Sequence, residues 1–325
     1  MEYNRLKDTE IKKGSRIYVS YLIHRVDVCD QKHGGKYLNM TIGDQSKVCN
    51  SVKLFGASEN AINSIVAGKV YRGAIDVKEY NGANSLVIYN IEEFEGADVR
   101  EYLSYEEGYV SDGEELKTII ASLPQNLNAL VQTCIDMTEG RFWYWTAAKR
   151  MHHSKLSGLL VHTTEVVKIA ASIYDNCKVP KYCDRNILIA SCILHDIGKC
   201  VEYNVDQQGT TEITTQGILE GHISIGVRIL EKASEFIKRR GIEVPNSDIE
   251  AIRHCILSHH GKLEFGSPVT PSTIEAIILH FADEISAQLN STREQMKEME
   301  VGNYVSSWVG DGYKNIYLRP DLVEK

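Results

Sequence analysis

The histidines of this 325-residue chain cluster in one part of the sequence. Nine of the eleven lie between His152 and His280, and most of these have apolar neighbours. Buried imidazole and carboxylate groups need partners that offset their loss of water, and a divalent metal ion can serve several of them at once. Taken one at a time, each such residue is also compatible with a hydrogen-bonded place in a protein core. The clustering favours a metal centre.

One stretch, residues 191–200 with the sequence SCILHDIGKC, brings these residue types closest together. It ends an apolar run, residues 187–194, and a helix that is apolar on every side is a buried helix. His195 and Asp196 follow at its C-terminal end, and Lys199 comes one turn later. Alone, this His-Asp pair predicts either a metal site or an aspartate that accepts a hydrogen bond from a core histidine.

Four other predicted helices carry histidine or aspartate in an apolar context. His162 lies near a helix start, and His222 begins an amphipathic helix that runs to residue 240. The adjacent pair His259 and His260 ends another helix, and Asp283 lies within an apolar helix. Along the chain the order is His, His-Asp, His, His-His and Asp, distributed over five helices. This ordered set predicts metal ligands rather than five separate core contacts.

The first hundred residues have a different pattern. Alternating β-branched and aromatic residues predict strands at 16–23, 37–42, 47–55, 69–77 and 85–94, with a short helix at 58–66. Three strands, a helix and two strands predict a five-stranded barrel of the OB type, which binds oligonucleotides through aromatic and basic side chains. Tyr37 and Phe55 are candidate stacking residues, although aromatic residues are also frequent in strands that bind nothing.

The predicted fold class is therefore α+β multidomain, with an N-terminal five-stranded OB-type β-barrel followed by an all-α helical bundle. We expect an OB-fold nucleic-acid-binding domain at 1–98, an acidic linker at 99–112, a helical metal-binding domain at 113–312 and a C-terminal tail at 313–325. Residues 201–213 are the expected exception among the helices, because the sequence DQQG at 206–209 predicts a small hairpin turn.

The order of these residues and their local sequences resemble the HD-domain metal-dependent phosphohydrolases. More narrowly, the barrel followed by this domain resembles the OB-fold/HD-domain 3′-to-5′ exoribonucleases of the YhaM type, over about residues 14–300. The similar stretches are WTAAKRMHH at 145–153, GLLVHT at 158–163, HDIGK at 195–199, GHI at 221–223 and SHHGKLEFGSP at 258–268.

The resemblance implies two divalent metal ions. One would be held by His162, His195, Asp196 and Asp283, and the other by His222, His259 and His260, with Asp196 bridging both. Ligands rich in histidine favour Mn²⁺, with Co²⁺, Fe²⁺ or Zn²⁺ as alternatives, over Mg²⁺ alone. Two such ions can share a bridging water and clamp a phosphate on its line of displacement.

The resemblance also implies that Asp196 and Lys199 are catalytic residues. Lys199 would stabilise the charge on a non-bridging phosphate oxygen, whereas its simpler interpretation is a lysine favoured by a helix C-terminus. Lys149, His152 and His153 form a basic group that either binds substrate phosphate or is an ordinary solvated face. We expect His254 and His280 to support ligands or to fill the core.

Composition limits the location and the partners of the chain. The net charge is −8, and residues 1–100 are almost neutral, with 14 basic and 13 acidic side chains. This differs from the basic balance usual for nucleic-acid binders, but bound cations would outweigh the local acidic charge. The eight cysteines include no CxxC pair, no apolar run is long enough to span a membrane, and the N-terminus lacks a signal peptide. We expect a cytoplasmic protein, with a homo-oligomer as an open alternative.

The sequence thus predicts a metal-dependent 3′-to-5′ exoribonuclease that hydrolyses single-stranded RNA to nucleoside monophosphates, with single-stranded DNA as a second candidate substrate. One alternative is a cyclic (di)nucleotide phosphodiesterase or nucleotide phosphohydrolase, which has no obvious need for the barrel. A non-enzymatic alternative is a module that only binds single-stranded nucleic acid. The complete ligand set disfavours this last alternative.

Overall fold

A computed structural model describes residues 3–31, 34–45, 47–80, 83–147, 155–179, 181–206, 211–297, 299, 304–306 and 315–319. The chain divides into two compact units. The first comprises residues 1–105 and 205–210, and the second comprises residues 106–204 and 211–325. The limits predicted for the four segments at 98, 112 and 312 stay predictions. Within the described residues, no helix has the length and apolar character that crossing a membrane requires.

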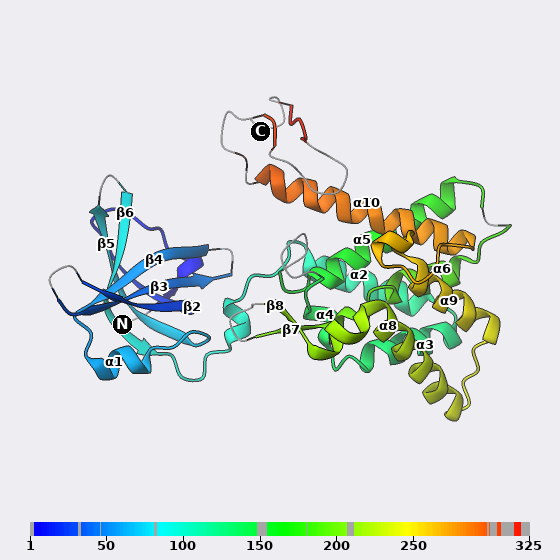
Figure 1. The fold of residues 1–325 in the computed structure, drawn as a ribbon, viewed down its shortest axis with the longest axis horizontal. Coiled ribbons are helices and arrows are strands. Elements are labelled where there is room, and N and C mark those ends of the chain that lie inside the picture. Colours follow the sequence, from blue (N-terminus) through cyan, green and yellow to red (C-terminus); the bar gives the residue numbers. More distant parts are fainter. Residues whose placement is uncertain are drawn as a thin grey trace. The chain divides into compact units, whose positions relative to one another are not determined.

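The first unit is built around a closed β-barrel, drawn from blue to cyan in Figure 1. Its sheet has the order β1-β2-β3-β4-β6-β5, and β2 also pairs with β5, so that the five strands from β2 to β6 form a closed ring. The parallel pairing of β4 with β6 and the helix α1 between β4 and β5 complete the topology. The bounds are β1 (Asn4–Arg5), β2 (Arg16–Asp30), β3 (Lys36–Asp44), β4 (Lys47–Phe55), α1 (Glu59–Ser64), β5 (Val70–Tyr80) and β6 (Ala83–Glu93).

Alternation of side chains along the strands produces the barrel core. In β2, Ile17, Val19 and Tyr21 are buried and lie in one hydrophobic cluster with residues from the other strands. Close strand approach requires glycine at one position, because a Cβ on Gly73 would lie 2.0 Å from the backbone oxygen of Asn90. This strand order and the buried faces confirm the predicted OB-type barrel.

The strand β2 is longer than predicted and continues to Asp30. The sequence pattern loses its clear alternation at the polar residue His24, and the β2–β3 register shifts between Ile23 and Arg25. A bulge of this kind lets one strand continue while its side chains change faces. The two-residue strand β1 was not predicted, because such a short segment carries no periodicity.

The segment predicted as a linker makes more contacts than expected. Tyr102 is buried, and its hydroxyl donates to Ser20 Oγ over 3.0 Å. The Arg5 guanidinium lies 3.8 Å from the centre of the Tyr102 ring and donates to both oxygens of Asp44, at 3.0 and 2.6 Å. These contacts tie the 3₁₀ helix η2 (Val99–Tyr102) to the barrel. The helix α2 begins at Tyr109, inside the predicted linker.

The second unit is helical, as predicted, and its other helices pack around one buried helix. Asp184 caps the N-terminus of this helix, α6, because its carboxylate accepts from the backbone N–H groups of Asn186 and Ile187, and residues 187–194 are all buried. It packs against α3, α5, α9 and α10. The bounds are α2 (Tyr109–Ser122), α3 (Gln125–Asp136), α4 (Arg141–Tyr144), α5 (Gly158–Asn176), α6 (Arg185–Leu194), α7 (Lys199–Glu202), α8 (Thr215–Arg239), α9 (Asn246–Ser258), η3 (Leu263–Phe265) and α10 (Ile274–Lys297).

The predicted hairpin interrupts these helices where expected. β7 (Tyr203–Val205) pairs with β8 (Thr211–Ile213), and the residues 207–210 between them lie outside the described residues. The helix α8 begins at Thr215, before the predicted start at His222. Its backbone leaves the helical conformation at Gly221, where φ is 69° and ψ is 156°. His222 therefore begins a helical segment as predicted, but a short helical segment precedes it.

Candidate metal centre

Two groups of side chains suited to metal binding lie in the helical unit. His162, His195 and Asp283 form the first group. His222, His259 and His260 form the second, and within each group one ligand atom per residue lies within 4.8 Å of the others. These are the two sets that the sequence predicted, without the residue expected to join them.

Asp196 lies between the two groups and presents a different oxygen to each. Its Oδ2 atom is 3.5 Å from Nε2 of His162 and 3.3 Å from Nε2 of His195. Its Oδ1 atom is 3.5 Å from Nε2 of His222 and 3.7 Å from Nε2 of His259. One carboxylate therefore faces both groups, which is the geometry that a bridging ligand requires.

Five helices position these side chains. His162 comes from the first half of α5, and Asp283 from the middle of α10. His195 and Asp196 follow the last residue of α6, while the pair 259 and 260 follows the end of α9. The break at Gly221 sets the position of His222, because a positive φ is easy for glycine and strained for other residues.

Hydrogen bonds to the backbone orient three of the histidine rings. Nδ1 of His195 lies 2.8 Å from the Cys192 carbonyl oxygen, and Nδ1 of His259 lies 2.8 Å from that of Ile256. Nδ1 of His260 lies 2.8 Å from the carbonyl oxygen of Phe265. Because a carbonyl only accepts, each Nδ1 carries the proton, and each Nε2 keeps its lone pair for the centre.

Side chains of other residues orient the remaining two rings, and the sequence did not predict these residues. His162 Nδ1 donates to Ser286 Oγ over 3.0 Å, and this hydroxyl donates to Glu165 Oε2 over 2.9 Å. Nδ1 of His222 lies 3.2 Å from Oε2 of Glu202, whose Oε1 also accepts from the His222 backbone N–H. Glu165 and Ser286 each lie three residues after a predicted ligand in their helices, so helical spacing was the signal available for these two.

Of the two histidines that we expected to support ligands or fill the core, His280 contacts the centre and His254 does not. His280 Nδ1 donates to the backbone oxygen of His259 over 2.9 Å, so His280 supports the turn that carries two histidines of the centre. His254 Nε2 accepts from the backbone N–H of Ser272 over 2.8 Å and contacts the loop before α10 instead.

The charges of the centre favour binding a cation. Burial opposes ionisation of Asp196, yet Lys199 and His195 hold the pKa of its carboxyl well below its usual range. Burial also opposes ionisation of Asp283, yet its contacts with His162 and the neighbouring His195 lower the pKa of its carboxyl. Burial and the neighbouring His195 hold the pKa of His259 well below its usual range. Carboxylates that stay ionised and an imidazole that stays neutral are the forms that bind metals.

Several buried atoms of the centre lack hydrogen-bond partners among the described residues. They are Oδ1 of Asp196 and the Nε2 atoms of His222 and His259. In addition, Nε2 of His162 and Nε2 of His195 lie 3.3 Å apart, and both can serve as ligand atoms because the Nδ1 atom of each ring carries a proton. The donor set therefore fits a divalent metal ion.

Lys199 lies at the same centre, as the sequence predicted. Its Nζ atom is 2.7 Å from Oδ2 of Asp196, and this contact raises its pKa although burial lowers it. Lys199 also lines a cavity of about 180 Å³ together with four of the metal-facing residues. Among the described residues, the lining consists of Ala147, His162, Asp196, Lys199, His260, Asp283, Glu284 and Ala287.

The candidate substrate-binding residues are only partly described. Lys149, His152 and His153 lie outside the described residues. Tyr37 and Phe55 are cross-strand partners in β3 and β4, and their rings are stacked with centres 5.2 Å apart and planes inclined by 27°. Phe55 is 46% exposed, so this pair lies on the outside of the barrel and not in its core.

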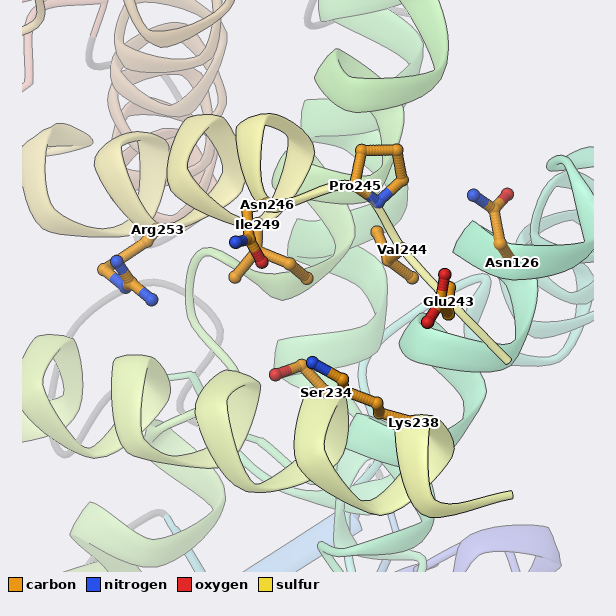
Figure 2. Close-up of a pocket in the computed structure, with 9 residues that line it drawn as sticks. All are labelled: Asn126, Ser234, Lys238, Glu243, Val244, Pro245, Asn246, Ile249 and Arg253. Carbon is orange, nitrogen blue, oxygen red and sulfur yellow. The ribbon is translucent and has the colours of Figure 1, made fainter. Parts of the chain in front are cut away.

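A larger cavity of about 630 Å³ lies elsewhere in the helical unit, between α3, α8 and α9 (Figure 2). Lys238 and Ser234 of α8 line it from one side and Asn246, Ile249 and Arg253 of α9 from the other (Figure 2). None of its lining residues is a predicted site residue. Cavity size therefore does not indicate the candidate site in this protein.

The helical unit defines the chain as an HD-domain protein, because the HD domain family matches residues 159–288. The chain is 30% identical over 279 residues to the 3′-5′ exoribonuclease YhaM of Bacillus subtilis, covering 84% of this chain and 85% of the relative. Its identity to the proteins of the same name from Bacillus velezensis and Bacillus pumilus is also 30% over 279 residues, with the same coverage. The chain belongs to the YhaM family, and the resemblance inferred from the sequence is confirmed.

A solved structure also aligns with part of the chain. It is the second OB-fold domain of replication protein A from Methanococcus maripaludis, which is 13% identical and covers 30% of this chain and 99% of that domain, with a TM-score of 0.23. The OB-type assignment of the barrel rests on its own strand order and registers.

Close packing at Gly198 gives a testable consequence for the centre. A Cβ at this position would lie 1.9 Å from the backbone oxygen of His222 and 2.8 Å from the nitrogen of Gly226. We expect Gly198→Ala to lower the free energy of unfolding by about 1–3 kcal/mol and to displace His222, because backbone atoms cannot yield as a flexible side chain does. Urea unfolding of the metal-free protein measures the first effect.

Gly226→Ala is the matched control. A Cβ at Gly226 would meet its nearest neighbour, Ile256 Cγ2, at an ordinary distance of 3.5 Å. Since alanine favours a helix over glycine, this variant should be as stable as the wild type or more stable by up to about 1 kcal/mol. Equal destabilisation by both substitutions would contradict the packing argument.

Proposed function

We propose that this protein is a metal-dependent 3′-to-5′ exoribonuclease that hydrolyses single-stranded RNA to nucleoside monophosphates. Membership of the YhaM family supports the reaction, since the relatives are named 3′-5′ exoribonucleases. The observation that carries the mechanism is the position of Asp196, whose two oxygens face two separate groups of ligands. A cyclic-nucleotide phosphodiesterase and a purely binding module are not favoured by these relatives.

The proposed centre holds two divalent ions, with Mn²⁺ as the first candidate and Co²⁺, Fe²⁺ or Zn²⁺ as alternatives. The ligands proposed for one ion are His162, His195, Asp196 and Asp283, and for the other His222, His259, His260 and Asp196. When bound, such a pair of ions lowers the pKa of a shared water and neutralises the phosphate that this water attacks. Glu202, Ser286 and Glu165 fix the rings of His222 and His162, which keeps their Nε2 atoms directed at the ions.

Asp196 and Lys199 are the proposed catalytic residues. Asp196 is 2% exposed and ionised, so its two oxygens are fixed in the positions that a bridging ligand needs. Lys199 stays protonated because Asp196 raises its pKa, and its ammonium group lines the cavity in which the phosphate would lie. A fixed positive charge at a phosphate oxygen stabilises the additional negative charge of the transition state.

The barrel is the proposed binding surface for the single strand. The stacked pair Tyr37 and Phe55 offers an exposed aromatic surface to a base, and Lys53 lies two residues from Phe55 on the same strand face. Lys149, His152 and His153 are proposed to contact substrate phosphate. Four other points likewise stay predictions: the segment limits at 98, 112 and 312, single-stranded DNA as a second substrate, a cytoplasmic location and a homo-oligomer.

Digestion of labelled RNA tests the proposed reaction. With Mn²⁺ present, single-stranded RNA labelled at its 5′ end should give a ladder that shortens from the 3′ end, because one terminal phosphodiester is hydrolysed at a time. Gel analysis and mass spectrometry of the released nucleotides measure this, with a cyclic dinucleotide as the competing substrate. Failure to shorten RNA with any of the four metals, or hydrolysis of the cyclic dinucleotide alone, would overturn the proposal.

Metal content of purified variants tests the assignment of ligands. The wild type should bind about two ions per chain. Asp196→Ala should lose both because Asp196 serves both groups, whereas His162→Ala and His259→Ala should each keep about one. Inductively coupled plasma mass spectrometry after dialysis gives these numbers, and His254→Ala, which lies outside both groups, serves as the control. Full metal content in Asp196→Ala would refute the bridging assignment.

Binding of RNA to barrel variants tests the aromatic surface. We expect Tyr37→Ala with Phe55→Ala to weaken binding of single-stranded RNA by about 1–3 kcal/mol for each lost stacked base. Fluorescence anisotropy without metal measures binding in the absence of cleavage. Tyr182→Ala removes an exposed aromatic side chain (67%) from the helical unit and should bind RNA as the wild type does. If the Tyr37/Phe55 double variant binds RNA as well as Tyr182→Ala does, Tyr37 and Phe55 are not part of the RNA-binding surface.

A further inference from the structure

The cavity at the metal centre is small for a whole nucleotide. Its volume is about 180 Å³, whereas pockets that enclose a drug-sized molecule are typically about 300–1,000 Å³. Four of its lining residues are proposed metal ligands and Lys199 is the proposed phosphate contact, so this part is suited to a phosphate. The other lining residues are Ala147, Glu284 and Ala287. The space they border is suited to the sugar next to that phosphate.

Glu284 is the one carboxylate in this lining that the two proposed ligand sets do not use. It follows Asp283 in α10, and Nε2 of Gln288, one turn later, donates to its Oε1 atom over 3.1 Å. Among the described residues, no hydrogen bond or ion pair occupies its Oε2 atom. The side chain is exposed at the mouth of the cavity. Glu284 is therefore held in place by Gln288 and available to a bound molecule.

The chemistry of a carboxylate determines what it can bind here. An ionised carboxylate only accepts hydrogen bonds, and it repels a phosphate group, which also accepts and is also negative. The hydroxyl groups of ribose can donate, and carboxylates bind ribose hydroxyls in nucleotide sites of other folds. Ala147 and Ala287, whose side chains are small, line the same cavity as Glu284 and the proposed metal ligands.

We propose that Glu284 binds the ribose hydroxyls of the 3′-terminal nucleotide and so selects an RNA end over a DNA end. This inference rests on the proposed function, because a 3′-to-5′ exonuclease places the terminal sugar beside the phosphate that it cleaves. The 2′-hydroxyl is the group that distinguishes the two kinds of end. The metal centre itself contacts the phosphate, which RNA and DNA share.

Two oligonucleotides that differ only in the terminal sugar test this proposal. Both are the same RNA labelled at the 5′ end, and one carries a 2′-deoxynucleotide at its 3′ terminus. Single-turnover rates for removal of the first nucleotide are measured with the full-length protein in Mn²⁺. The wild type should remove the ribonucleotide about 10- to 100-fold faster, the range expected for one hydrogen bond to a charged group. Glu284→Ala should abolish this preference by slowing only the removal of the terminal ribonucleotide.

Two further variants and a binding measurement sharpen the test. Glu284→Gln keeps an acceptor oxygen and should retain part of the preference for the ribonucleotide. Glu294→Ala removes a carboxylate of α10 that does not line the cavity, so this variant should retain the full preference. Calorimetry with uridine monophosphate and its 2′-deoxy form should show the same loss of discrimination in Glu284→Ala. Metal content should be unchanged in every variant.

The possible failures are distinguishable. If the wild type shortens RNA from the 3′ end but removes both terminal sugars equally fast, the role of Glu284 is wrong and the proposed function stands. Equal slowing of both ends by Glu284→Ala also overturns the inference, because it indicates a contact to phosphate or metal. A preference that depends on the terminal base instead of the sugar assigns Glu284 to a base amine. If the wild type degrades no RNA, the proposed function itself fails.

Discussion

The helical unit depends on one buried carboxylate. Asp196 is 2% exposed and follows the end of a helix whose residues 187–194 are all buried. Burying such a charge without partners costs several kcal/mol, so the surrounding elements must supply positive or donating groups. Lys199 supplies one such group, and the cations proposed to bind between Asp196 and the two groups of ligands that face its oxygens would supply the others. This arrangement explains why α5, α8, α9 and α10 each bring a ligand to the end of α6.

Close backbone packing keeps these ligands in place. Gly198 lies against the backbone of His222, and Gly261, with a φ of 77°, lies against the ring of His280, where a Cβ would approach to 2.2 Å. His280 in turn donates to the backbone of His259. The glycines that follow His195-Asp196 and His259-His260 thus allow the turns to approach other elements closely. The proposed pair of ions would need this rigidity, because the ligands must hold the ions at a fixed separation.

Much of the fold and of the site follows from local sequence patterns. Alternation predicts the strands of the barrel, and an apolar run predicts the buried helix α6, because both patterns reflect which face is buried. The proposed metal ligands could be found because their residue types are rare in apolar helices. The extension of β2 past Ile23 could not be predicted, because it depends on pairing with β3 across a shift in register. The start of α2 at Tyr109 has no capping side chain that would mark it, and a glycine such as Gly221 does not by itself indicate a break within a helix. The same holds for Glu202 and Ser286, which act only through the histidines that they contact in three dimensions.

A crystal structure of the protein with Mn²⁺, phased with the anomalous scattering of the metal, tests the bridging role of Asp196 most directly. Two anomalous peaks are expected about 3.5–4 Å apart, one beside His162, His195 and Asp283 and the other beside His222, His259 and His260. Asp196 should coordinate both, with Oδ2 on the first and Oδ1 on the second. A single peak, or two peaks of which only one contacts Asp196, would contradict it.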